Sequence, residues 1–390
     1  MLVIGAGPAG SAAACVLAAA GRHVLIADQQ TFPRDKICGD GLISDALHAL
    51  TALGVDADVT SEAWRGQELR LYAPNLRHVT LRSDFACLPR ERLDDILLTA
   101  ARRAGADFRR ATAVSPLLNG NGVAGARFTT PEGGLEVRAG ITILAVGANA
   151  TVLNAFGLAA PTKPDAVAGR AYYEVTSGNA PAIDHLVIAY DRGWCPGYGW
   201  IFPSPGGRFN IGVALFGATA ARGRLHRFFD AFCRTFPPAA GLLATSTCIR
   251  PFRGAPIRSG LQQLSAGRPG LLAAGEAMAT TYSATGEGIG KALESGMLAA
   301  EMVDDALRTR RPLAGLADAY RMEFLRRFGA RYRAYRVAQR WAGSPMLLNV
   351  LATRANAGRY VQAELEALIR EQGDASSLFS AGGFLKALVG

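Results

Sequence analysis

The first thirty residues alternate short apolar runs with a stretch of small residues. Residues 1–5 form an apolar run that predicts a buried strand, and residues 11–20 are small enough for a closely packed helix. Gly21 ends that predicted helix, and residues 23–28 predict a second strand. A strand, a tight turn, a helix and another strand in this order predict the start of a parallel βαβ unit.

Farther along the chain, apolar and polar residues alternate with the period of strands. With glycine-rich turns between the runs, this pattern predicts strands at residues 111–118, 123–130, 135–146, 170–176, 185–190, 199–203 and 209–216. Residues 88–103 instead have the apolar spacing of an amphipathic helix. Residues 270–300 return to strand, loop and helix, and the chain from residue 308 onward has a helical pattern.

These patterns predict an α/β protein with a discontinuous nucleotide-binding domain. We assign residues 1–150 and 265–305 to a three-layer, Rossmann-like domain and residues 151–264 to an inserted, β-rich substrate domain. Residues 306–390 form a helical C-terminal region that closes with a short amphipathic tail, SLFSAGGFLKALVG. A chain of 390 residues suits two closely packed domains.

Composition narrows the class of protein. Apolar residues make up 49% of the chain and charged residues 19%, which argues against disorder. No apolar run is long enough to span a bilayer, and we expect no signal peptide because the chain opens directly on its first strand. The six cysteines form no CxxC pair and no cluster with histidine, so we expect no disulfide framework, no metal site and a cytoplasmic location.

The net charge of +10 is concentrated near the C-terminus. Residues 308–370 contain thirteen arginines and four acidic residues. A basic surface of this kind suits anionic lipid headgroups or nucleic acid. Because no nucleic-acid motif accompanies it, we expect no nucleic-acid partner, and the alternatives are a solvated helical face or peripheral contact with an anionic membrane. The aromatic residues Phe324, Phe328, Tyr332 and Tyr335 recur near helical spacing here, which indicates either packing on the domain body or an edge that meets lipid.

A glycine fingerprint follows the first predicted strand. The GAGPAG segment at residues 5–10 allows a tight turn and lets backbone N–H groups approach a pyrophosphate at the start of the helix. Asp28 ends the second predicted strand, where a carboxylate accepts hydrogen bonds from ribose hydroxyls. This combination predicts one dinucleotide site.

The segment PRDKICGDG at residues 33–41 follows the βαβ unit. It places Cys38 between Lys36 and Asp40 in a glycine-flexible loop. A buried cysteine is commonly a small apolar residue, but charged neighbours and flanking glycines favour a role at the cofactor. Lys36 is either a solvated loop charge or a contact to a cofactor pyrophosphate or substrate.

Several motifs together resemble known flavoproteins. The GAGPAG start, the RxxxD at Arg90 to Asp94 and the GE…TGEGI block in residues 271–289 resemble the FAD-binding fold of p-hydroxybenzoate hydroxylase. Within that group, PRDKICGDGL and GYGWIFPSPGGRFNIGV at residues 197–213 are similar to segments of the geranylgeranyl reductase family, including its YxWxFP motif. The resemblance covers nearly the whole chain.

The resemblance implies FAD as the cofactor. Its contacts would be Gly5, Gly7, Ala9, Gly10, Asp28, Cys38, Gly39, Gly41, Arg90, Val114, Gly275, Glu276, Gly288 and Ile289. Among these, Val114 would touch the adenine and Cys38 would lie at the flavin. A helix starting near Gly288 would direct its positive end at the negative charge of the reduced flavin.

Three aromatic residues of the YGWIFP segment are the candidate substrate contacts. Tyr198, Trp200 and Phe202 either pack in the sheet or line a substrate cavity. Cys38, Tyr198 and Trp200 are the candidate catalytic residues, with Cys38, Tyr198 or an ordered water as the proton donor.

The activity that the resemblance implies is reduction of carbon–carbon double bonds in a hydrophobic prenyl lipid or quinone by reduced FAD. NAD(P)H or another transient reductant would supply the electrons. One alternative is a flavin-dependent monooxygenase of secondary metabolism; a halogenase is disfavoured because Tyr198 replaces the first tryptophan of the WxWxIP motif. Another is a non-catalytic flavoprotein with a binding or maturation role, because Glu276 and Ser283 replace the aspartate and proline usual in the family.

Overall fold

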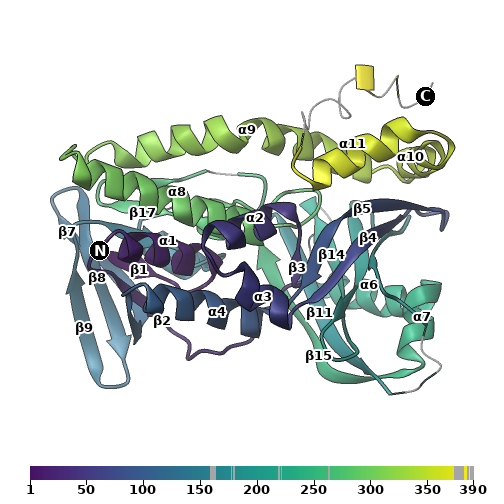
Figure 1. The fold of residues 1–390 in the computed structure, drawn as a ribbon, viewed down its shortest axis with the longest axis horizontal. Helices are drawn as coiled ribbons and strands as arrows, with labels where there is room; N and C mark the ends of the chain where they lie inside the picture. Colours follow the sequence, from purple (N-terminus) through teal and green to yellow (C-terminus); the bar gives the residue numbers. More distant parts are fainter. Residues whose placement is uncertain are drawn as a thin grey trace.

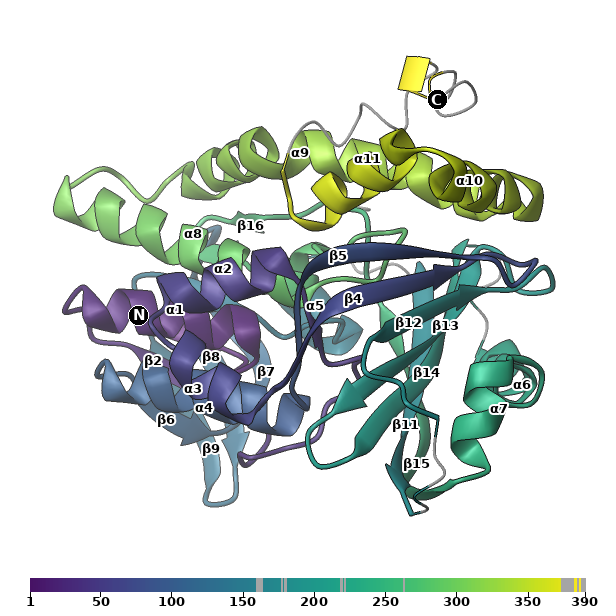
Figure 2. The same cartoon turned by 45° about the vertical axis from the view of Figure 1, so that its right-hand side comes forward.

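The computed structural model describes residues 1–372 apart from 159–163, 177, 179–180, 218–219, 221 and 262–263, together with residues 382, 383 and 386. Two parts built around β-sheets lie side by side, and long helices run over both (Figure 1, Figure 2). Most of the predicted amphipathic tail lies outside the described residues. Within the described chain, no helix combines the length and apolar character needed to cross a membrane.

The first part is built on a six-stranded sheet with the order β16-β17-β10-β1-β2-β6. Its strands are β1 (Leu2–Ile4), β2 (Leu25–Asp28), β6 (Asp107–Arg110), β10 (Thr142–Leu144), β16 (Gly267–Arg268) and β17 (Leu271–Ala273). All neighbours pair in parallel except β16 with β17. Residues 271–273 therefore complete a sheet that residues 2–4 begin.

Two layers cover this sheet. On one face lie α1 (Pro8–Ala19), α4 (Arg90–Arg103) and α8 (Ile289–Arg308). The other face packs against a three-stranded sheet of β7 (Thr112–Asn119), β8 (Gly122–Thr130) and β9 (Gly133–Arg138), followed by α5 (Ala150–Ala155). The two faces make this an α/β fold of three layers, as predicted.

Helices α1 and α8 approach closely because small residues face each other. A Cβ atom on Gly296 of α8 would collide with the carbonyl oxygen of Ala9 in α1. The glycine is therefore required by packing, and it brings the N-terminal ends of both helices to one region of the sheet.

One predicted strand is corrected by the structure. Residues 135–146 read as a single alternating run, but they form β9 and β10 in two different sheets. The chain leaves the three-stranded sheet after Arg138 and enters the six-stranded sheet at Thr142. Alternation alone does not distinguish one long strand from two short ones joined by a tight crossing.

The second part is an eight-stranded sheet with the order β15-β11-β14-β13-β12-β4-β5-β3. Its strands are β3 (Gly41–Leu42), β4 (Trp64–Tyr72), β5 (His78–Cys87), β11 (Ala166–Val175), β12 (Leu186–Tyr190), β13 (Gly197–Ser204), β14 (Arg208–Phe216) and β15 (Ser246–Ile257). The helices α6 (Arg222–Thr235) and α7 (Pro237–Leu243) cover its outer face. Residues 41–87 supply three of the strands, although we had assigned them only to the nucleotide-binding domain.

The C-terminal helices form a layer over both parts. They are α9 (Leu316–Ala342), α10 (Pro345–Ala357) and α11 (Arg359–Ile369). Helix α9 lies over α8, and α10 and α11 lie over β5 (Figure 2). Phe324, Tyr332 and Tyr335 are buried in the core of the first part, which confirms packing on the domain body for these aromatic residues.

Candidate functional site

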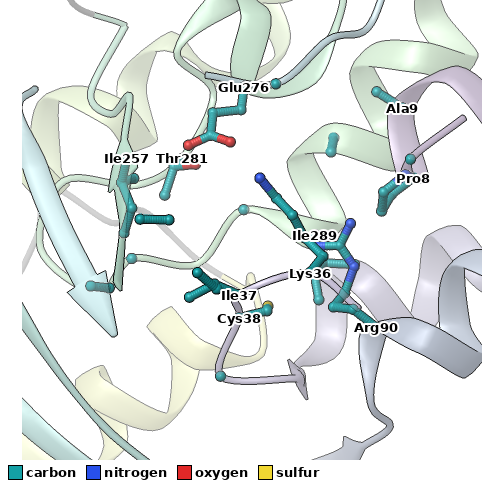
Figure 3. Close-up of a pocket in the computed structure, with 18 of the residues that line it drawn as sticks. Pro8, Ala9, Lys36, Ile37, Cys38, Arg90, Ile257, Glu276, Thr281 and Ile289 are labelled. Carbon is teal, nitrogen blue, oxygen red and sulfur yellow. The ribbon is translucent and has the colours of Figure 1, made fainter. Parts of the chain in front are cut away.

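A cavity of about 660 Å³ extends from the six-stranded sheet to the inner face of the eight-stranded sheet. Most predicted site residues line it: Gly5, Gly7, Ala9, Asp28, Lys36, Cys38, Gly39, Gly41, Arg90, Tyr198, Trp200, Phe202, Glu276, Gly288 and Ile289. Lys36 projects into the cavity, with Arg90 and Ile289 beside it and Glu276 on the opposite wall (Figure 3). The volume lies within the range of about 300–1,000 Å³ that ligand pockets occupy.

The glycine turn between β1 and α1 forms a cradle at one end of the cavity. Gly5 has a φ of +101°, which favours glycine, and a Cβ on Gly10 would collide with the carbonyl oxygen of Gly5. A Cβ on Gly7 would meet no atom closer than 3.8 Å, so this position opens to the cavity. Asp28 ties the turn to β2 because its Oδ2 accepts a 2.8 Å hydrogen bond from the Ala6 N–H.

Two arginines lie beside this cradle. The Arg90 guanidinium makes a bidentate contact with Asp94 at 2.7 and 2.8 Å, and Arg34 reaches the same carboxylate at 2.8 Å. Asp94 is fully buried, so one carboxylate holds two cations and leaves a net positive charge. Guanidinium groups suit phosphate oxygens. Arg34 was missed in the sequence, although it precedes the Lys36 that we singled out.

Three predicted cofactor contacts do not line the cavity. Gly10 lies behind the turn, and Gly275 lies against Ala9, where a Cβ would be 2.8 Å from the Ala9 Cβ. Val114 is 51% exposed. Thr112 and Ala113, on the same strand, line the cavity.

The Cys38 loop is held by a buried hydrogen-bond network. The Asn210 side chain donates 2.8 Å hydrogen bonds to the Cys38 carbonyl and to the Asp40 carboxylate, and it accepts one from the Trp200 indole at 2.9 Å. The Tyr172 hydroxyl also donates to Asp40. Asp40 has a φ of +65°, so these bonds hold a strained residue within the loop.

Burial determines the protonation states of Asp40 and Cys38 in this loop. It raises the pKa of Asp40 to about 6, although hydrogen bonds from Tyr172 and Asn210 oppose the shift. Burial also raises the pKa of the Cys38 thiol, which therefore stays neutral near pH 7. Sequence reasoning missed Asn210 and Tyr172, because nothing in a strand pattern says which polar residue meets a distant loop.

The aromatic residues of β13 form one wall of the cavity. Tyr198, Trp200 and Phe202 alternate along the strand, and neighbouring ring centroids are 6.2 Å apart. Gly39 lets the loop approach this wall, since a Cβ there would lie 3.3 Å from the Phe202 ring. Beyond the wall, the cavity continues along the apolar residues Leu69, Phe85, Leu186, Ile188 and Ile369.

Glu276 reaches across to the strand β10 side of the cavity. Its Oε1 accepts a 3.1 Å hydrogen bond from the Arg258 N–H. A Cβ on Gly147 would lie 3.4 Å from its Oε2. The carboxylate therefore occupies the space beside the glycine that ends the AVG segment, and its extra methylene relative to aspartate is accommodated there.

Glu287 is a cavity residue that sequence reasoning quoted only as part of TGEGI. It lies between two glycines immediately before α8. Burial raises its pKa to about 8, and the charge of Asp45 adds to the shift. The sequence did offer one sign that Glu287 belongs to the site, because it directly precedes the expected flavin contacts Gly288 and Ile289.

The arrangement fits a flavin dinucleotide. The open position at Gly7 and the Arg34–Arg90 pair suit a pyrophosphate, and α8 begins at Ile289 on the cavity wall, so the positive end of its dipole lies at the cavity. The apolar arm beyond Phe202 leaves room for a second, hydrophobic molecule.

Comparisons with known proteins agree with this arrangement. The model of an FAD binding domain matches residues 1–182. A menaquinone reductase of Mycolicibacterium smegmatis is 33% identical over 324 residues, which cover 78% of this chain and 76% of the relative. Digeranylgeranylglycerophospholipid reductase 1 of Methanopyrus kandleri is 30% identical, covering 79% of this chain and 80% of the relative.

A solved structure has the same fold. A geranylgeranyl bacteriochlorophyll reductase-like protein from Thermoplasma acidophilum superimposes with a TM-score of 0.81 at 24% identity. The match covers all of this chain and 95% of that protein.

Proposed function

Because the chain belongs to the geranylgeranyl reductase family of FAD-dependent oxidoreductases, we propose that it reduces carbon–carbon double bonds in the prenyl chain of a lipid or quinone. The observation that carries the proposal is the continuity of the cavity. It leads from the glycine cradle past Cys38 to an aromatic wall and then to an apolar arm. A prenyl chain has the shape and chemistry for that arm.

Bound reduced FAD would supply a hydride to the substrate, and NAD(P)H or another transient donor would restore its electrons. Gly7, Arg34 and Arg90 would hold the pyrophosphate, and Asp28 the ribose. The α8 N-terminus favours the negative charge that a reduced flavin carries.

The chain's own residues account for how an apolar alkene would be positioned. Trp200 and Phe202 would press the chain against the Cys38 loop, and Leu186 and Ile188 would continue the apolar contact. Burying each methylene group contributes about 0.8 kcal/mol, so a long prenyl chain would bind without a charged anchor. Exclusion of water by these side chains also protects the transferred hydride.

The proposal is tested by the lipids themselves. Extracts of cells with and without the gene would be compared by mass spectrometry of quinones and prenyl lipids. The proposed function requires one species to gain the mass of two hydrogen atoms per reduced bond only when the gene is present. Unchanged isoprenoids, or a product that has gained oxygen, would favour the monooxygenase instead.

We also propose that the basic face of α9 contacts an anionic membrane at the cytoplasmic side. Arg326, Arg333 and Arg340 recur at seven-residue spacing on this helix, all of them exposed, and Met322 on the same face is 71% exposed. A helical face that combines arginines with an apolar side chain suits anionic lipid headgroups.

Vesicle sedimentation tests this contact. Vesicles of phosphatidylcholine with phosphatidylglycerol should bring down the protein at low salt, and phosphatidylcholine alone should not. The double variant Arg333→Glu, Arg340→Glu should stay in the supernatant while keeping its bound FAD. Equal sedimentation of the variant would contradict the proposed membrane contact.

A further inference from the structure

Glu287 occupies a position that no contact so far explains. It lines the cavity between the aromatic wall and the start of α8. The neighbouring Thr285 carbonyl accepts a hydrogen bond from the Tyr198 hydroxyl, and the charges of Glu287 and Cys38 both act on that hydroxyl. Glu287 and Cys38 are therefore two ionisable groups close enough to act on the Tyr198 hydroxyl.

The Glu287 carboxyl is poorly stabilised as an anion, although a hydrogen bond with Thr285 favours its charged form. Its Oε2 is shielded from solvent and has no hydrogen-bond partner among the residues that the structure describes. A buried carboxylate without a donor costs free energy, whereas a neutral carboxyl keeps a proton that it can donate.

The cation whose charge acts on Glu287 already pairs with other carboxyl groups. Lys291, one turn into α8 and fully buried, lies 3.4 Å from Asp45 and 3.0 Å from Glu371, and it also pairs with Glu294. Three carboxyl groups thus surround one ammonium group, and even with Arg331 3.5 Å from Glu371 the cluster has no spare positive charge.

These charges explain the ionisation of Glu287. Burial raises its pKa to about 8 and the charges of Asp45 and Glu371 add to the rise, while a hydrogen bond with Thr285 and the charge of Lys291 oppose it. The other titratable groups whose ionisation responds to Glu287 are phenols: Tyr190, Tyr198 and Tyr335. At pH 7 the carboxyl is therefore mostly protonated.

The other proton donors in the cavity are weaker acids. Burial raises the pKa of the Cys38 thiol above its usual 9.0 and raises that of the Tyr198 phenol well above 10.0. An efficient general acid has a pKa near the working pH, so that it is both protonated and willing to release its proton. Glu287 meets both conditions.

We propose that the neutral Glu287 carboxyl is the catalytic acid that protonates the alkene, a role that rests on the proposed function. The π bond of the alkene breaks as one carbon takes the hydride supplied by reduced flavin, which is thereby oxidised. The other carbon takes the proton from Glu287 and forms the second C–H bond. The resulting carboxylate, whose Oε2 has no hydrogen-bond donor among the described residues, regains its proton from solvent before the next turnover.

The test compares Glu287→Gln with Glu294→Gln. Both changes remove, at nearly constant volume, one carboxyl that interacts electrostatically with Lys291, but Glu294 does not line the cavity. With a prenyl substrate that the wild type reduces, Glu287→Gln should lower kcat by roughly 100-fold or more and leave the FAD absorbance spectrum unchanged. Glu294→Gln should stay within a few-fold of the wild type.

The pH profile gives a second readout. Wild-type kcat should fall as pH rises through about 8, because ionised Glu287 holds no proton. The residual activity of Glu287→Gln should not show this fall in kcat near pH 8. If kcat of the variant falls in the same way near pH 8, or if it equals that of the wild type, Glu287 is not the catalytic acid.

Infrared spectroscopy tests the protonation state without turnover. Oxidised wild-type protein should show a carboxyl C=O stretch that disappears above about pH 8 and is absent from Glu287→Gln. A spectrum without such a band would contradict the proposal directly. If the wild type reduces no prenyl chain while the band is present, the proposed function has failed and the catalytic role fails with it.

Discussion

Cys38 depends on residues far away in the sequence for its position. Asn210, on β14, holds both the carbonyl of Cys38 and the carboxyl of Asp40, while Trp200 orients Asn210. The Cys38 thiol is therefore positioned by a hydrogen-bond network that includes Trp200 of the aromatic wall. A change in the wall would alter the loop, and effects of substitutions within this network will not be additive.

Cys38→Ser separates a chemical role of the thiol from packing. Serine is similar in size, so FAD absorbance should be unchanged. If the thiol takes part in alkene reduction or shapes the approach of the alkene, turnover should fall by roughly tenfold or more, as measured by product mass spectrometry. Unchanged turnover would mean that Cys38 is only a packing residue.

Asp40 makes stability depend on pH. Its pKa is about 6 in the folded protein, above the ordinary aspartate value of 3.8, so between these values the folded state holds a proton that the unfolded state has lost. The free energy of unfolding should therefore fall as pH rises from about 4 to about 6 and then level off.

Asp40→Asn should remove this contribution. As pH rises from about 4 to 7, the free energy of unfolding of the variant should increase relative to that of the wild type by up to roughly 3 kcal/mol. Urea unfolding at each pH measures this difference. Asp107→Asn, at an exposed position, is the control for loss of one negative charge. A difference from the wild type that stays constant with pH would show that Asp40 does not titrate in this range.

At the scale of elements, the packing of α1 on α8 determines where two helix N-termini meet the cofactor cavity. Gly296→Ala should destabilise the protein by about 1–3 kcal/mol, because its Cβ would collide with the backbone of Ala9. Gly329→Ala, in the middle of α9, is the matched control: its Cβ would meet atoms no closer than 3.6 Å.

The free energy of unfolding of Gly329→Ala should increase by about 0.5–1 kcal/mol, since alanine is a better helix former than glycine. Thermal unfolding and the FAD content of the purified protein measure both variants. Equal melting temperatures for the two would mean that α8 can shift away from α1 without cost.

The elements that depend on local signals were predictable from the sequence, and those that depend on long-range pairing were not. The βαβ unit around Gly7 and the start of α8 at Ile289 follow from glycine motifs and periodicity. The pairing of β4 with β12, which joins residues 69–72 to 186–189, has no signature in either strand. For the same reason Asn210 and Glu287, whose importance comes from distant partners, were not singled out.

At the scale of the whole molecule, the C-terminal layer closes the apolar arm of the cavity. Ile369, the last residue of α11, lines the same cavity as Gly7 and Asp28. Ile369→Ala should raise KM for a long prenyl substrate by roughly tenfold, because several methylene contacts are lost, while FAD binding stays the same. A short prenyl analogue that does not reach α11 is the control, and an equal rise in its KM would contradict this assignment of the arm.

The strands of the six-stranded sheet are separated in the sequence by strands of the eight-stranded sheet, and this order affects how the chain folds during translation. Strand β1 is translated well before its neighbour β10, and β10 needs β17, about 130 residues later, before the sheet is covered on that side. The nascent chain must therefore carry the apolar edge of β10 unpaired while five strands of the eight-stranded sheet, β11 to β15, are translated. We expect the nascent chain to depend on chaperones over this interval and to bind FAD only once α8, which completes the cofactor site, has emerged.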